Sequence, residues 1–209
     1  MDENFKDQLI AAYDADASRR ADDTKKRSEW KREARQQFAN FARSKNKKSI
    51  LEIGAGAGLD SKFFQDQGFE VLATDLSPKM ADECKKLGLS AKAIDLYDLE
   101  QLGRKFDAIY SLNVLLHVPP QDLVQVLSTI SNCLRPDGLF FYGVYGGIHK
   151  ENTFTDPNQM NMPRYFSFLD DQTMVKTAST VFDVVKTETI DIGDDPLGLH
   201  FQSLLLRKK

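Results

Sequence analysis

The sequence is poor in cysteine, in histidine and in long apolar runs. Cys84 and Cys133 are the two cysteines among 209 residues, too few for a disulfide framework, and each stands in an apolar helical pattern that predicts a buried thiol. The longest apolar stretches, such as the one that begins at Leu139, are too short to cross a bilayer. The N-terminus also lacks the basic and apolar regions of a signal peptide. We therefore expect a cytoplasmic protein with no metal site and no membrane contact.

A large excess of charge of one sign is also missing. The chain carries 28 Lys and Arg against 31 Asp and Glu, and 41% of its residues are hydrophobic, which is ordinary for a globular protein. Residues 1–50 hold an excess of basic side chains, which raises the question of an RNA partner. Acidic residues are interspersed among them, so a solvated helix face is the favoured interpretation. The slightly acidic total disfavours a nucleic-acid partner, and the oligomeric state stays open.

The length suits one globular core domain with a helical extension, and we place the extension at residues 1–47 and the core at residues 48–209. Apolar residues at helical spacing predict two helices in the extension, from Leu9 to Ala17 and from Trp30 to Phe41. From Ser49 onward, strands and helices alternate, which is typical of a parallel sheet with helices on both faces. The last two strands are joined by a link too short for a helical crossover, so we expect them to pair antiparallel.

Caps and turns mark several boundaries of this alternation. Ser77, Pro78 and Gly88 have the N-cap, first-turn and C-terminal positions of one helix. Asp60 is expected to cap the helix that begins near Leu59 and ends before Gly68. A turn over residues 135–138, with the sequence RPDG, is expected to close an amphipathic helix before the fifth strand begins.

The stretch ILEIGAGAGLDS, residues 50–61, places three glycines at alternate positions after the first strand of the core. In an open α/β sheet a ligand binds at this point, because glycine allows positive φ angles and a close approach to the backbone. A dinucleotide motif would need a glycine where Leu59 stands, which disfavours an NAD-dependent oxidoreductase. Glu52 at the start of the loop would repel a pyrophosphate and would suit a ligand with an ammonium or sulfonium charge.

The segment LEIGAGAG resembles the first motif of the class I S-adenosylmethionine-dependent methyltransferases, and four further stretches resemble later motifs in the order of that family. These are VLATDLSP, AIDLYDL, FDAIYSLNVLLHVP and LRPDGLFFYGVYG, and the resemblance covers residues 48–146. It implies a Rossmann-like α/β fold whose seven-stranded, mostly parallel sheet has the order 3-2-1-4-5-7-6, with the last strand antiparallel and helices on both faces. The implied cofactor is S-adenosylmethionine (SAM), and the implied product is S-adenosylhomocysteine (SAH).

The resemblance also implies a set of cofactor contacts. Asp75 would take both ribose hydroxyls, since a carboxylate can accept two hydrogen bonds from a vicinal diol. Asp95 would accept from the adenine amino group, Leu96 would donate its backbone N–H to the ring, and residues 111–113 would lie beside the methionine part. The complete expected set is Glu52, Gly54, Ala55, Gly56, Gly58, Asp75, Leu76, Ser77, Asp95, Leu96, Ser111, Leu112 and Asn113.

His117 follows the fourth-strand motif and is the expected general base, because the pKa of an imidazole suits that task. A structural hydrogen bond at the strand end is the competing interpretation. The long loop over residues 146–163 is expected to wall or cover the acceptor pocket. Trp30 is assigned either to a lid or to core packing. The expected acceptor-binding residues are Tyr13, Tyr145, His149 and Tyr165.

The favoured function is methyl transfer from SAM to a small-molecule acceptor by in-line displacement, for which holding the reacting atoms in line is a large part of catalysis. One alternative is a tRNA or rRNA methyltransferase that docks its substrate on the basic N-terminal helix. Another is a SAM-binding protein without catalysis. No motif of the sequence encodes the identity of the acceptor, or whether its oxygen, nitrogen, sulfur or carbon is methylated.

Overall fold

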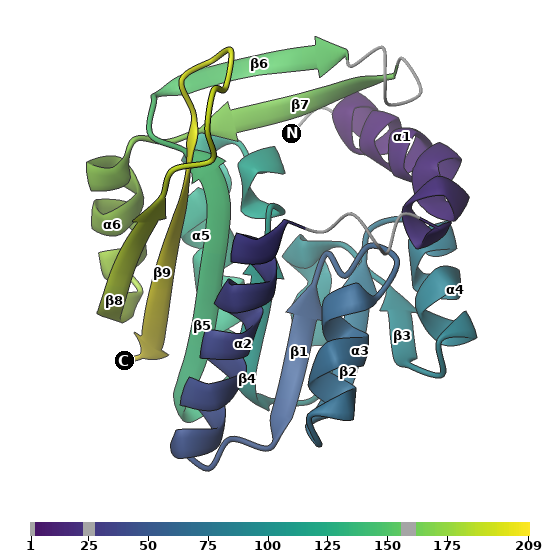
Figure 1. Cartoon of the computed structure of the whole chain (residues 1–209), viewed down its shortest axis with the longest axis vertical. Helices are drawn as coiled ribbons and strands as arrows, with labels where there is room; N and C mark the ends of the chain where they lie inside the picture. The colour runs from purple at the N-terminus through teal and green to yellow at the C-terminus, as the bar shows by residue number, and fades with distance from the viewer. Residues whose placement is uncertain (1–2, 23–27, 156–161) are drawn as a thin grey trace. The chain divides into compact units, whose positions relative to one another are not determined.

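The computed structural model describes residues 3–22, 28–155 and 162–209, and it is an α/β fold (Figure 1). In chain order its elements are α1 Glu3–Asp22, α2 Glu29–Ser44, β1 Ser49–Ile53, α3 Leu59–Asp66, β2 Glu70–Asp75, α4 Pro78–Lys86, β3 Ser90–Ala93, η2 Leu96–Leu102, β4 Phe106–Leu112, η3 Leu115–His117, η4 Pro120–Asp122, α5 Leu123–Asn132, β5 Leu134–Gly146, β6 Lys150–Thr155, β7 Pro163–Phe168, α6 Asp171–Ser179, β8 Phe182–Ile190 and β9 His200–Lys208. Both helices expected in the extension are present, as α1 and α2. Two strands, β6 and β7, were not predicted.

Seven strands form one sheet in the order β3-β2-β1-β4-β5-β9-β8. The pairs β1–β2, β2–β3 and β4–β5 are parallel, whereas β9 runs antiparallel to both β5 and β8. Because β8 and β9 are the sixth and seventh strands of this sheet along the chain, the order is the expected 3-2-1-4-5-7-6, and the predicted fold class is confirmed. All five residues of β1 are buried, as expected for a parallel strand with both faces covered.

The chain divides into two compact units. The described residues of the first fall within 1–95 and 153–165, and those of the second within 96–152 and 166–209. The first unit therefore holds α1 to α4 with β1, β2 and β3, and the second holds β4, β5, β8 and β9 with α5 and α6. The division passes through β6 and β7, which pair with each other as a two-stranded sheet. A domain boundary after residue 47 stays a prediction from the sequence.

In the first unit, α2 packs through a short apolar face. This face consists of Phe38, Ala39 and Ala42. The ring of Phe38 meets that of Phe64 in α3 edge to face, with 5.9 Å between the ring centroids. Trp30, at the start of α2, is half-buried and lies outside this face.

The expectation that Asp60 caps α3 is wrong. The N-cap of α3 is Gly58, which has a φ angle of 83° and makes no side-chain cap hydrogen bond. Asp60 is buried instead, and it accepts a hydrogen bond from Arg35 of α2 at 3.0 Å. The carboxylate thus joins α2 to α3, and the pairing compensates a charge that burial would otherwise penalise. Ser77 does cap α4 as expected, since its side chain accepts from the Met80 amide.

Two expectations about the second unit also need correction. Residues 135–138 are not a separate turn, because β5 extends from Leu134 to Gly146 and includes them. They lie where the register of the pairing between β4 and β5 shifts. Asp137 there has a φ angle of 56°, which departs from strand geometry. The stretch after β5 is also not wholly a loop, since β6 and β7 lie in it. Most side chains of β6 are exposed, so the hydrophobic alternation that marks a strand is missing from its sequence.

Both cysteines are buried thiols, as predicted. Burial raises the pKa of Cys84 to about 12 and the pKa of Cys133 to about 11. Within residues 3–22, 28–155 and 162–209, no helix has both the length and the apolar character needed to span a bilayer. The same residues contain no group of three or more His, Cys, Asp and Glu side chains that could hold a metal ion.

Candidate cofactor site

The glycine loop follows the carboxyl end of β1 in the first unit (Figure 1). Gly54, Gly56 and Gly58 have φ angles of 67°, 54° and 83°, all in the left-handed region that residues with a Cβ rarely adopt. The Ala55 amide donates to the Thr74 carbonyl of β2, and the Gly58 amide donates to the Ala55 carbonyl, each at 2.9 Å. The backbone of the loop is therefore fixed in a conformation that requires glycine.

Gly56 and Gly58 have different surroundings. A Cβ at Gly58 would lie 2.8 Å from Leu89 Cδ1 and 3.0 Å from Cys84 Sγ. A Cβ at Gly56 would meet no heavy atom of the described residues within 4 Å. Packing therefore disfavours a side chain at position 58, whereas Gly56 borders open space through which a ligand can approach the backbone.

Alanine at these two positions is expected to separate stability from cofactor binding. Gly58→Ala should lower the free energy of unfolding by about 2 to 4 kcal/mol, because left-handed strain adds to an overpacked contact. Gly56→Ala should lower it by only about 1 to 2 kcal/mol of backbone strain, yet it should weaken SAH binding. Urea unfolding and calorimetric titration of both variants measure the two effects. Equal losses of stability would contradict the distinction.

Asp75 ends β2 and ties the glycine loop to the turn before α4. Its Oδ2 accepts the Gly56 amide at 2.8 Å, and its Oδ1 accepts the Ser77 amide at 2.9 Å. Burial raises the pKa of this carboxyl above its ordinary value, while the two amides and the charge of Arg20 oppose that shift. A carboxylate held by backbone amides beside the glycine loop has the position and the acceptor capacity to bind a diol.

α1 contributes polar side chains to this site that the sequence did not single out. Lys6 Nζ lies 2.5 Å from Asp95 Oδ2, just beyond β3. Asp14 accepts a hydrogen bond from the Ser77 hydroxyl, and a second one from the Lys79 amide at 3.2 Å. Two of the expected cofactor residues, Asp95 and Ser77, therefore already contact α1.

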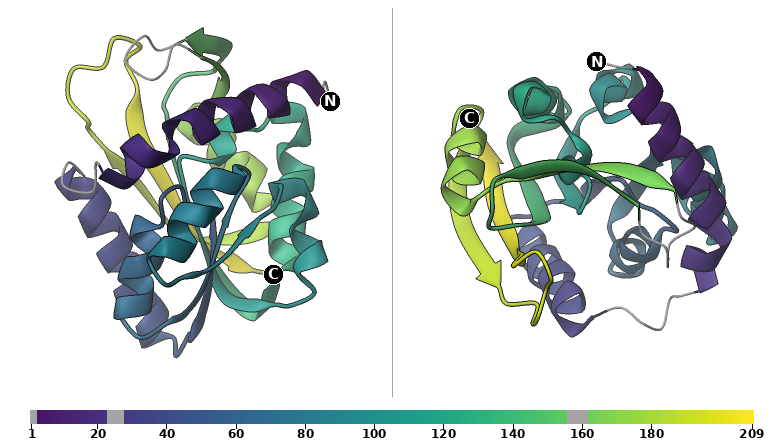
Figure 2. Two further views of the ribbon diagram at one scale, coloured as in Figure 1. Left: turned by 90° about the vertical axis from the view of Figure 1, so that its right-hand side faces the viewer. Right: turned by 90° about the horizontal axis from the view of Figure 1, so that it is seen from above.

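Tyr13 lies in the same part of the first unit. Its ring centroid is 5.1 Å from the guanidinium carbon of Arg20 and 5.8 Å from that of Arg164. Burial raises the pKa of the Tyr13 phenol, and the charges of these two arginines oppose the shift. Phe5 and Tyr165 also meet edge to face at 5.6 Å, so α1 lies beside the start of β7 (Figure 2). Two of the expected acceptor-binding residues, Tyr13 and Tyr165, therefore belong to this contact.

Glu52 is buried near the end of β1, 3% exposed. Its Oε2 accepts a hydrogen bond from the Ser61 hydroxyl of α3 at 2.5 Å, and its backbone carbonyl accepts from the Thr74 hydroxyl at 2.7 Å. The side chain thus takes part in joining β1 to α3. Its expected interaction with a cationic ligand stays a prediction.

The second unit places Ser111 and Asn113 at the end of β4. The Ser111 Oγ is buried and has no hydrogen-bond partner among the described residues. Asn113 has a φ angle of 59°, and its Oδ1 accepts the Tyr145 amide at 3.2 Å. Left-handed backbone at a residue other than glycine is concentrated at ligand sites, and a buried hydroxyl without a protein partner suits a polar ligand. Both features are compatible with the expected role of residues 111–113, which stays a prediction.

The two histidines proposed for the reaction differ in their surroundings. His117, on η3, is 9% exposed, and its ring centroid lies 4.7 Å from that of Phe166. The His149 side chain is 60% exposed, and its Nδ1 is 4.0 Å from Asp170 Oδ2. Tyr145 is half-buried within β5. The roles of His117, His149 and Tyr145 toward an acceptor stay predictions.

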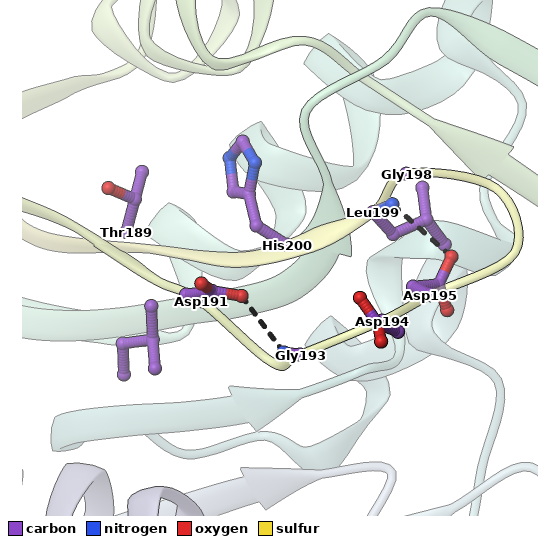
Figure 3. A pocket seen from close by; sticks show the side chains of 9 residues that line it. Thr189, Asp191, Gly193, Asp194, Asp195, Gly198, Leu199 and His200 are labelled. Atoms are coloured by element: carbon purple, nitrogen blue, oxygen red, sulfur yellow. Dashed lines mark hydrogen bonds between the residues drawn. The ribbon is translucent and has the colours of Figure 1, made fainter.

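A hollow at the turn between β8 and β9, also in the second unit, contains none of the expected cofactor residues (Figure 3). It is lined by Thr189, Ile190, Asp191, Gly193, Asp194, Asp195, Gly198, Leu199 and His200. Asp191 accepts the Gly193 amide at 2.9 Å. Asp195 accepts the amides of Leu197 and Leu199. These two carboxylates hold the turn together and give no sign of a cofactor site.

The first unit fits the nucleoside part of SAM. Asp75 is the last residue of β2, and Asp95 follows the end of β3, its parallel neighbour, at a strand spacing of about 4.8 Å. The Ile94 amide donates to the Asp75 carbonyl at 2.8 Å and fixes the register between the two carboxylates. With open space at Gly56, the site has acceptors for a diol and for an exocyclic amine in neighbouring positions.

The central part of the chain is similar to known proteins. Residues 50–138 match the family model described as a methyltransferase domain. Over 98 residues the chain is 32% identical to the ubiquinone biosynthesis O-methyltransferase of Agrobacterium fabrum, a match that covers 44% of this chain and 38% of that protein. The chain spans between 38% and 48% of the length of the ubiquinone biosynthesis O-methyltransferases that it matches.

Solved structures show the same fold over nearly the whole chain. The 1,6-didemethyltoxoflavin-N1-methyltransferase of Burkholderia thailandensis, with bound SAH, is 24% identical with a TM-score of 0.67, covering 96% of this chain and 89% of its own. The magnesium protoporphyrin IX methyltransferase of Synechocystis, also with bound SAH, is 15% identical with a TM-score of 0.70, covering 98% and 99%. Residues 50–138 thus match a methyltransferase domain, and the chain has the fold of these S-adenosylmethionine-dependent enzymes.

Proposed function

We propose that this protein transfers a methyl group from SAM to a small-molecule acceptor. The observation that carries the proposal is Asp75, whose carboxylate is held by the Gly56 and Ser77 amides at the carboxyl end of β2. Such an acceptor beside a left-handed glycine loop is suited to a ribose diol. The Burkholderia and Synechocystis relatives are named for small acceptors, which supports the same class of acceptor here.

Each part of the site has a separate task in this proposal. Bound SAM supplies an electrophilic methyl carbon on a sulfonium. Asp75 orients the ribose, Asp95 accepts from the adenine amino group, and the loop of residues 54–58 lets the ligand approach the backbone. Ser111, which is buried near the end of β4, donates to or accepts from the polar end of the methionine part. Holding the ligand at several points favours an in-line approach of the acceptor.

The acceptor contacts are proposed for aromatic and imidazole side chains. Aromatic faces suit both a sulfonium and an apolar or aromatic acceptor. His117 serves as general base for acceptors that must lose a proton before attack. The proposed contacts with the acceptor are Tyr13, Tyr145, His149 and Tyr165. The cytoplasm stays the compartment that the sequence predicts.

Calorimetric titration with SAH, with NAD as the parallel ligand, tests the cofactor. We expect SAH to bind with a dissociation constant in the micromolar range, about −8 kcal/mol, and NAD not to bind. Binding of NAD alone would mean that the glycine loop holds a pyrophosphate, and the methyltransferase proposal would then be wrong. Conversion of SAM to SAH in the presence of candidate acceptors would next distinguish an enzyme from a binding protein without catalysis.

A further inference from the structure

Lys6 lies against the carboxylate to which the proposed function assigns the adenine amino group. Lys6 Nζ lies 2.5 Å from Asp95 Oδ2, and the two side chains are 28% and 17% exposed. In the proposed function, on which this inference rests, Asp95 is the acceptor for the exocyclic amino group of adenine. That assignment is what the family resemblance implies, and the strand order is compatible with it, because Asp95 follows β3, the parallel neighbour of the strand that ends in Asp75.

The lysine ammonium and the adenine amino group differ in charge and in how firmly each is held in place. The lysine ammonium is a charged, flexible donor on a partly exposed side chain, so its pairing with Asp95 is a modest and reversible contact. The adenine amino group is neutral, but the rest of a bound nucleoside holds it in place. A ligand anchored through its ribose can therefore displace the ammonium, although part of its binding free energy is lost in doing so.

α1 has a second attachment that does not depend on Lys6. Asp14, two helical turns further along, accepts from the Ser77 hydroxyl and from the Lys79 amide at the start of α4. Breaking the contact between Lys6 and Asp95 would thus leave α1 attached through Asp14 and through the ring contact of Phe5 with Tyr165. Figure 1 shows α1 and α4 as neighbours.

We propose that Lys6 sets the affinity for the cofactor and its selectivity for adenine, by competing with the adenine amino group for the carboxylate of Asp95. Entry of adenine shifts the ammonium into solvent. The same lysine lowers discrimination against a hypoxanthine base, because the ammonium can donate to a carbonyl oxygen that Asp95 would repel.

Lys6→Met removes the ammonium that competes for Asp95 and keeps a long side chain. We expect SAH to bind three- to tenfold more tightly to this variant than to the wild-type protein. The preference for SAH over its analogue with hypoxanthine in place of adenine should rise by at least the same factor. Isothermal titration calorimetry with both ligands gives the two numbers. Lys6→Arg, which keeps the charge, should retain the wild-type affinity and selectivity.

Lys85→Met is the matched control, because Lys85 pairs with Asp82 on the exposed side of α4. It makes the same change of charge in the same unit and should leave both affinities unchanged. Raising the salt concentration should tighten SAH binding to the wild-type protein relative to Lys6→Met, since salt screens the pair of Lys6 with Asp95. If Lys6→Met proves poorly folded in thermal melts, Lys6→Gln takes its place.

The outcomes separate this proposal from the proposed function. Equal or weaker SAH binding by folded Lys6→Met, with unchanged base selectivity, overturns the role of Lys6 and leaves the cofactor assignment standing. Failure of the wild-type protein to bind SAH overturns the proposed function, and this proposal with it. Tighter binding together with sharper selectivity supports the competition, because a merely structural role for Lys6 would not change the preference between two bases.

Discussion

Asp75→Ala is expected to weaken SAH binding by about 1.5 to 3 kcal/mol, roughly 10- to 150-fold, as for the loss of hydrogen bonds to a charged acceptor. The carboxylate is positioned for this role because the amides of Gly56 and Ser77 hold both of its oxygens. Asp82→Ala on the exposed side of α4 is the control and should leave the affinity unchanged. Calorimetry on both variants measures the difference, and an unaltered affinity in Asp75→Ala would show that the ribose lies elsewhere.

Because of the Asp75 carboxyl, SAH binding and the stability of the fold should depend on pH in opposite directions. Burial raises its pKa above the ordinary 3.8, so its contribution to stability is present below that value and is lost as the pH rises through the raised pKa. SAH binding needs the ionised form as acceptor, so affinity should fall as the pH falls through the same value. Urea unfolding and SAH titration between about pH 4 and 7, with Asp75→Asn as the reference, test both signs. A parallel change of stability and affinity with pH would contradict this account.

Most elements of the main sheet and the glycine loop could be predicted because their requirements are local. Glycine at positions 54, 56 and 58 reports a backbone that needs positive φ, and each of these residues has it. The cap at Ser77 likewise depends on residues within one turn. The antiparallel edge followed from the short link between the last two strands. A sequence pattern predicts such features directly, since each depends on residues that are close together in the chain.

The contacts of α1 could not be predicted, because their partners lie far along the chain. Lys6 meets Asp95, and Asp14 meets Ser77, across 89 and 63 residues. One signal was available: Lys6, Tyr13 and Arg20 are spaced by seven residues and therefore share one face of the helix. Asp60 illustrates the reverse case, since a residue type that caps helices instead pairs with Arg35, 25 residues away. Residue type alone does not tell a local partner from a distant one.

His117→Asn is expected to lower the rate of methyl transfer by about 10²- to 10⁴-fold for an acceptor hydroxyl or protonated amine, while SAH affinity stays unchanged. The imidazole must be neutral to accept a proton, so the wild-type rate should rise with pH as the imidazole loses its proton. In the variant that rise should disappear. The measurement is the rate of SAH formation as a function of pH, with an acceptor identified by screening.

His200→Asn supplies the matched control, because His200 lies in the β8–β9 hairpin with its Nε2 2.8 Å from Asp171 Oδ1. It should leave both the rate and its pH dependence unaltered. If His117→Asn reduces stability but keeps the wild-type pH profile, the imidazole serves to pack against Phe166, 4.7 Å from it. An acceptor that is already a nucleophile, such as a carboxylate or thiolate, would then account for a transfer that needs no base. The pH profile thus distinguishes a role in proton transfer from a role in packing, which the loss of activity alone would not do.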